Sequence, residues 1–134
     1  MKHIFKLLKT SWGIVVLIDV EEIIDEEVLL YDIAITDTIF LKLNWQPSPY
    51  KQEVVQLLGK AISDFIKLFP LSKKICFNIT ELDFVETDFQ EEGLYYVMLE
   101  WLAKRYNFQL PSLNAYYDKE TNKYIFPSLI QPHQ

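Results

Sequence analysis

Six carboxylates stand close together in the second half of the chain, and these are the residues that could do chemistry. They are Glu81, Asp83, Glu86, Asp88, Glu91 and Glu92. Hard divalent cations bind several carboxylate oxygens at once, so such a cluster could hold a metal. A buried pair of carboxylates could also act as acid and base, and Asp83 with Glu86 would be the first pair to consider. No glycine stands where a calcium loop needs its sharp turn, so we expect neither a resident metal nor a cofactor.

Other catalytic groups are scarce. The two histidines, His3 and His133, stand near the ends of the chain, where we expect mobility. The single cysteine, Cys76, falls within a predicted strand, where a lone thiol is more often a packed side chain than a nucleophile. We therefore expect a protein that is not an enzyme, with a metal- or carboxylate-dependent enzyme as one alternative.

Charge and composition narrow the class of partner. The chain has 134 residues, a formal net charge of −6 and half of its residues hydrophobic, which predicts one packed domain over residues 1–134. A net negative charge repels nucleic acid and favours a basic partner. A lone cysteine is typical of a reducing compartment, so we expect a cytoplasmic protein. The apolar run at residues 14–18 is too short to cross a membrane.

The apolar pattern predicts the elements that would position the acidic cluster. Alternating or β-branched runs predict strands, and we expect the first of them to be central, with both faces covered. Apolar residues at helical spacing after a proline predict the first helix, and Asp88 opens the second. We expect strands at 14–20, 28–35, 38–45 and 75–80, helices at 49–69 and 88–106, and short strands at 114–117 and 124–126.

This order predicts an α+β fold in which strands precede a helix, a strand and a second helix (β-β-β-α-β-α). A mixed or antiparallel sheet would be covered on one face by the two helices, and a small hairpin would follow. The acidic cluster would then form a turn and the first turn of the second helix. Tyr95 and Tyr96 follow on that helix and cannot both face the core.

Four segments carry a family resemblance: residues 13–17, 49–69, 75–79 and the turn at 85–94, which reads VETDFQEEGL. Their order resembles the fourth domain of elongation factor G, a member of the ribosomal-protein-like β-α-β superfamily. The resemblance implies a fold, and it leaves association with the ribosome or RNA as an alternative function. That alternative requires a basic patch built from Lys67, Lys73, Lys74, Lys104 and Arg105.

The preferred hypothesis is a non-catalytic domain that binds a basic protein, of the kind represented by immunity proteins that neutralise basic toxins. Exposed carboxylates would steer such a partner, and tyrosines are enriched at binding hot spots. The predicted binding residues are Glu81, Asp83, Glu86, Asp88, Glu91, Glu92, Tyr95 and Tyr96.

Overall fold

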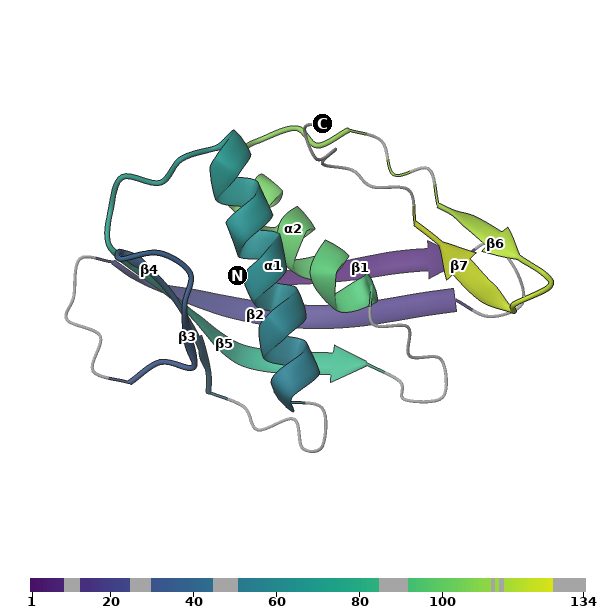
Figure 1. Cartoon of the computed structure of the whole chain (residues 1–134), viewed down its shortest axis with the longest axis horizontal. Coiled ribbons are helices and arrows are strands. Elements are labelled where there is room, and N and C mark those ends of the chain that lie inside the picture. Colours follow the sequence, from purple (N-terminus) through teal and green to yellow (C-terminus); the bar gives the residue numbers. More distant parts are fainter. Residues whose placement is uncertain are drawn as a thin grey trace.

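A computed structural model describes most of the chain (Figure 1). The described residues are 1–8, 13–24, 30–44, 51–84, 92–111, 113 and 115–126.

A five-stranded mixed sheet forms the centre of the described structure. From one edge to the other its strands are β1 (Lys2–Leu8), β2 (Gly13–Ile24), β5 (Ile75–Phe84), β4 (Ile39–Leu43) and β3 (Ile33–Ala34). β1, β2 and β5 pair antiparallel to one another, whereas β4 pairs parallel to β5. Parallel neighbours need a crossover, and helix α1 (Lys51–Leu68) supplies it between β4 and β5.

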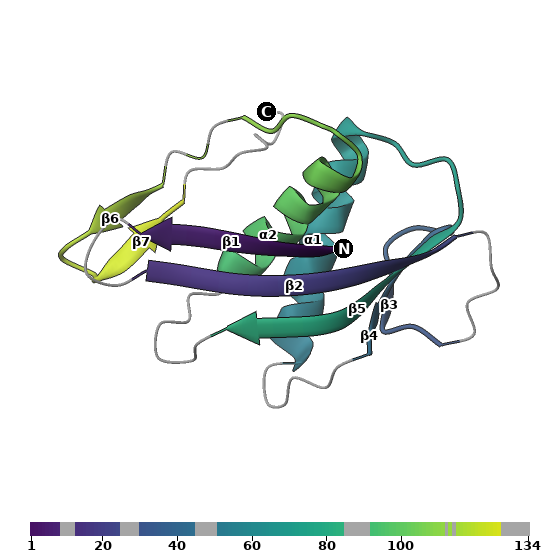
Figure 2. The same ribbon diagram turned by 180° about the vertical axis from the view of Figure 1, so that it is seen from behind.

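Two helices cover one face of this sheet. α1 and α2 (Glu92–Arg105) lie side by side in front of the strands in Figure 1, while Figure 2 looks onto the opposite face, where β1, β2 and β5 stand in front. The buried core lies between the helices and the sheet, and it includes Ile18, Phe65, Phe77 and Trp101. In β2, the even-numbered residues from Ile14 to Val20 face this core.

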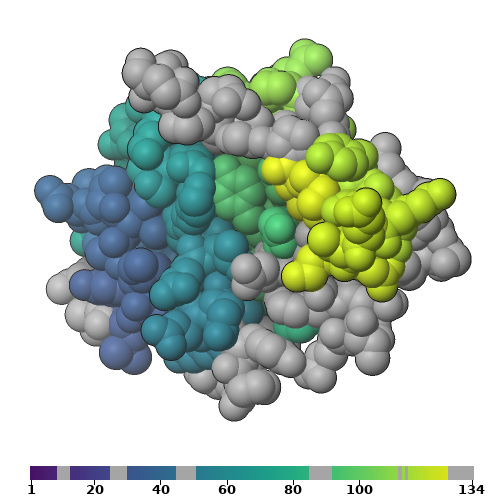
Figure 3. Space-filling view, turned by 45° about the vertical axis from the view of Figure 1, so that its right-hand side comes forward, coloured from purple at the N-terminus to yellow at the C-terminus, as the bar shows by residue number. Residues whose placement is uncertain are grey.

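The two helices differ in how much of their surface is buried. α1 has one apolar stripe, as expected of a helix with water on its other side. α2 instead buries nine of its fourteen residues. In the space-filling view, α1 and the segment containing β6 (Tyr116–Asp118) and β7 (Lys123–Ile125) lie on either side of α2 (Figure 3). Since it is covered on several sides, α2 needs apolar residues around most of its circumference.

The predicted fold class is confirmed: the structure is α+β, with a mixed sheet, two helices on one face and a C-terminal hairpin formed by β6 and β7. β2 is an interior strand of the sheet, as expected for a central position. The predicted starts of both helices, at Pro49 and Asp88, lie outside the described residues.

Several boundaries of the predicted strands were wrong. β1 was not predicted at all, and it places a strand before those that were. β5 continues through Glu81 and Asp83 to Phe84, so these two residues, which were assigned to a turn, belong to a strand. In the predicted strand 28–35, only Ile33–Ala34 pairs as a strand among the described residues. β2 was expected to have both faces covered, yet Val15 is 41% exposed.

Candidate functional site

The structure separates the predicted binding residues. Glu81 and Asp83 lie on β5, both exposed, whereas Glu92 begins α2 on the other side of the sheet. The remaining carboxylates of the cluster, Glu86, Asp88 and Glu91, lie outside the described residues. Among the described residues, Glu81 and Asp83 therefore lie on the opposite side of the sheet from Glu92.

The two tyrosines have structural contacts. Tyr96 is buried and stacks against Phe5 and Phe126. The hydroxyl of Tyr95 donates a hydrogen bond of 2.7 Å to Asp64 of α1. Burial, and then this hydrogen bond to a carboxylate, raise the pKa of Tyr95, because both favour the neutral phenol. Tyr95 thus joins the two helices, and Tyr96 belongs to the core.

Glu81 and Asp83 project from the face of the sheet that no described helix covers, which we call the open face. Residues that pair directly across antiparallel strands point to the same side, so Asp19 lies beside Glu81 and Leu17 beside Asp83. Glu21, two residues after Asp19 on β2, is also exposed on this side. Four carboxylates from two neighbouring strands therefore share the open face, and two of them, Asp19 and Glu21, were not among the predicted binding residues.

The open face also exposes apolar side chains. The exposed fractions are 46% for Ile4, 63% for Leu8 and 41% for Val15. Ile4 pairs with Leu17, and Leu17 pairs in turn with Asp83. The aliphatic side chains of β1 and β2 thus adjoin the carboxylates of β2 and β5.

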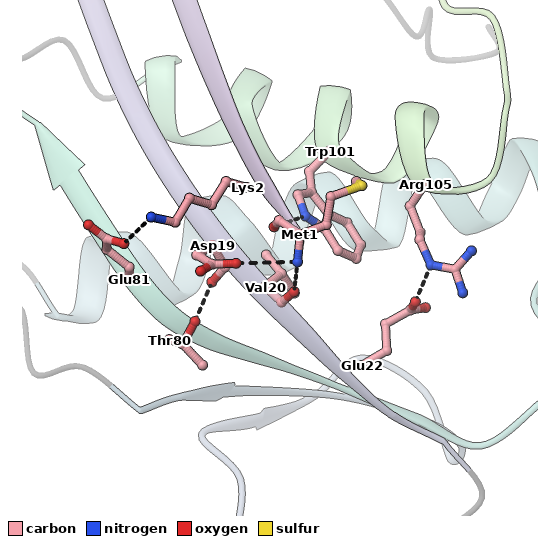
Figure 4. Close-up of polar contacts among 9 residues, drawn as sticks. All are labelled: Met1, Lys2, Asp19, Val20, Glu22, Thr80, Glu81, Trp101 and Arg105. Atoms are coloured by element: carbon pink, nitrogen blue, oxygen red, sulfur yellow. Dashed lines mark hydrogen bonds and ion pairs between the residues drawn. The ribbon is translucent and has the colours of Figure 1, made fainter.

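Ion pairs hold part of this surface (Figure 4). The amino group of Met1 lies 3.3 Å from a carboxylate oxygen of Asp19 and donates a hydrogen bond to the carbonyl of Val20. Lys2 lies 3.5 Å from Glu81. Glu21 and Asp83 form no ion pair with another described residue, so these two carboxylates keep their charge available to a partner.

His3, expected to be mobile, instead lies on β1. Its Nε2 is 2.7 Å from Oε1 of Glu100 on α2. The pairing of β1 with β2 fixes the backbone of His3. The charged residues at the start of the chain did not indicate a strand.

Cys76 is buried, as expected for a packed thiol. Burial is the largest cause that raises the pKa of this thiol, which disfavours the reactive thiolate. Beside it on the same strand, Asn78 is 8% exposed, and its Oδ1 accepts no hydrogen bond from a residue that the structure describes. No group of three or more histidine, cysteine, aspartate or glutamate side chains converges as a metal site among the described residues.

A pocket of about 230 Å³ lies at the end of the sheet where β2 finishes and β5 begins. Lys73, Arg105 and Tyr106 contribute to its lining. Beside it, the largely buried carboxylate of Glu22 accepts hydrogen bonds from Nε of Arg105 and from the hydroxyl of Tyr106. Burial and then the bond to Glu22 raise the pKa of Tyr106.

The basic patch required by an RNA-binding function is only partly assembled. Lys73 and Arg105 line one pocket. Lys67 lies 3.9 Å from Asp64 in an ion pair within α1, and Lys74 lies over the ring of Phe40. Lys104 is exposed near the end of α2.

Comparisons with known proteins give no relative: no family model, no curated protein and no solved structure matches the chain. The resemblance to the fourth domain of elongation factor G therefore stays a prediction. None of the described helices has the length and apolar character needed to cross a membrane.

Proposed function

We propose that this protein is a non-catalytic binding domain whose open face binds a basic protein. The observation that carries the proposal is the grouping of Asp19, Glu21, Glu81 and Asp83 on two neighbouring strands, on the face opposite the helices. The proposed binding surface therefore lies on the sheet, whereas the sequence predicted it at the turn and second helix. Glu81 and Asp83 belong to both surfaces.

The charge balance supports a basic partner. The open face also carries the positive charges of Lys2, Lys6, Lys42 and the Met1 amine, and of these Lys2 and the amine are paired with Glu81 and Asp19. The negative field comes from the chain as a whole, whose net charge of −6 includes these groups. A partner of opposite sign would be drawn toward this field before contact, which raises the association rate.

The exposed aliphatic side chains indicate that a partner would be bound in contact with the open face and would not only be attracted to it electrostatically. Ile4 and Val15 lie on neighbouring strands of the open face and are each more than 40% exposed. Covering apolar surface contributes roughly 25 cal/mol for each Å² removed from water. An apolar strip bordered by charged groups is the composition of a protein-binding surface.

The arrangement of the carboxylates favours binding over catalysis. Glu81 and Asp83 are exposed along one face of a strand, whereas acid and base catalysis needs groups positioned against a substrate in a cleft. A small acidic protein of the immunity type, which covers a basic toxin, is the concrete example that we propose.

Charge reversal on the open face tests this function. The tagged protein, its Glu81→Lys, Asp83→Lys variant and a Glu53→Lys, Glu120→Lys control would each be used to capture partners from the native host at low salt. The control changes the net charge equally at two exposed positions, on α1 and in the hairpin turn. One basic protein that the first variant loses and the control retains would support the proposal. Equal capture by both variants would refute it.

A further inference from the structure

The pocket at the end of the sheet has apolar walls and a charged rim. Phe69 and Leu71, which follow α1, and Ile75, the first residue of β5, supply apolar surface, while Lys73 and Arg105 supply two cationic groups. Its volume of about 230 Å³ is smaller than that of pockets for drug-sized ligands. The pocket therefore suits a small molecule with an apolar body and an anionic group.

Glu22 holds Arg105 in place at this pocket. The Glu22 side chain is only 8% exposed, and one of its oxygens accepts the bond from Nε of Arg105. In Figure 4 this contact involves Nε, while the two terminal nitrogens lie on the other side of the guanidinium. Tyr106 adds a second bond to Glu22, and its ring lies 5.2 Å from the guanidinium carbon of Arg105. A guanidinium fixed in this way loses less entropy when it binds a carboxylate.

The charged side chains at the pocket indicate the net charge of the ligand. Lys73 and Arg105 contribute two positive charges, and Glu22 contributes one negative charge. Two of the carbonyls at the end of α2 accept hydrogen bonds: Asn107 adopts a positive φ of 54°, and the amides of Asn107 and Phe108 donate to the carbonyls of Lys104 and Ala103. Among the described residues at the pocket the charges sum to one positive charge, which matches a monoanion better than a phosphate dianion.

We propose that this pocket binds a small monocarboxylate with an aromatic or branched aliphatic body. The carboxylate would be bound by the terminal nitrogens of Arg105 and by Lys73, and its body would pack against Phe69 and Leu71. This site is separate from the open face, so the proposal for the pocket does not depend on the proposed function.

The probe pair for the test is 4-fluorobenzoate and its neutral analogue 4-fluorobenzamide, each titrated with the protein by ¹⁹F NMR. We expect saturable binding of the benzoate, with the amide at least tenfold weaker. Lys73→Met and Arg105→Met should each weaken benzoate binding about tenfold, because each removes one charge-assisted contact with the carboxylate. Lys104→Met is the matched control, since Lys104 is exposed on the same helix and does not line the pocket.

Arg105→Met also leaves the Glu22 carboxylate without an ion partner, so it could unfold the protein. Lys73→Met keeps the test decisive, because Lys73 is exposed and lies outside the helices and strands. Absence of benzoate binding at about 10 mM, equal binding of the amide, or an equal loss in Lys104→Met would overturn the proposal.

Discussion

The indole Nε1 of Trp101 donates a 2.7 Å hydrogen bond to the backbone carbonyl of Met1, across 100 residues of sequence. Trp101 is 1% exposed, and its ring packs edge-on against Phe77 of β5. One side chain of α2 therefore contacts both the chain start at β1 and the middle of the sheet. This contact explains why the charged opening residues are ordered.

Trp101→Phe tests this link. The variant loses the hydrogen bond and part of the buried ring, so we expect the free energy of unfolding to fall by about 1–3 kcal/mol. Urea denaturation followed by circular dichroism measures this change. Tyr116→Phe is the control, because Tyr116 is 55% exposed, and it should change stability by less than about 0.5 kcal/mol. Equal stability of Trp101→Phe and the wild type would contradict the contact.

Replacing the glycine of each helix by alanine should change the stability of the protein in opposite directions. A Cβ on Gly93 would stand 2.8 Å from Ile14 and 3.0 Å from Val16, both stiff β-branched side chains of the core. On Gly59 it would meet Ile35 at an ordinary 3.4 Å. We expect Gly93→Ala to destabilise the protein by about 1–3 kcal/mol and Gly59→Ala to stabilise it by about 0.5–1 kcal/mol. The same denaturation measurement checks both, and a stabilising Gly93→Ala would show that α2 packs less closely on β2.

Alkaline pH should weaken the fold through Tyr95 and Tyr106. Burial and hydrogen bonds to carboxylates raise the pKa of both phenols in the folded state. Their stabilisation is therefore complete below the unfolded pKa of about 10 and is lost as the pH rises above it. The free energy of unfolding, measured between about pH 8 and pH 11, should decline less in a Tyr95→Phe, Tyr106→Phe variant than in the wild type. Parallel profiles for the two proteins would contradict the role assigned to these phenols.

The edge strand β1 carries lysines that should prevent self-association. Met1 and Val20 exchange backbone hydrogen bonds, so by alternation Lys2, Ile4 and Lys6 direct their backbone groups toward the outer edge. Charged lysines on such an edge oppose pairing with a second chain. We expect Lys2→Val, Lys6→Val to sediment as larger species in analytical ultracentrifugation, unlike a Lys73→Val, Lys119→Val control at exposed sites off the strands. An unchanged sedimentation profile would argue against this role.

The sequence predicted the elements of the fold correctly where the apolar residues followed a single period, either that of a strand or that of a helix. Ile75, Phe77 and Ile79 alternate with Cys76, Asn78 and Thr80 in the sequence, and β5 forms there as predicted, although Cys76 and Asn78 are buried as well. β1 was missed because Ile4 and Leu8 have the same parity as Lys2 and Lys6, so alternation does not separate a buried from an exposed side.

The candidate site was harder to predict because it is assembled across strands. Glu81 and Asp83 alternate with Leu82 and Phe84, which is a strand signal, but their closeness to other carboxylates favoured a turn. The alternation in β2 could have identified Asp19 and Glu21 as outward residues. Their position beside β5 depends on strand order and register, which sequence periodicity does not contain.

The association rate with the captured basic protein is the most direct test of the central claim. It would be measured for the wild type, Glu81→Lys, Asp83→Lys and Glu53→Lys, Glu120→Lys, at about 20 and 200 mM salt. We predict that the open-face variant associates at least tenfold more slowly at low salt, with a smaller difference at high salt, while the control stays within about threefold of the wild type. Equal rates for the two variants at low salt would contradict binding through the open face.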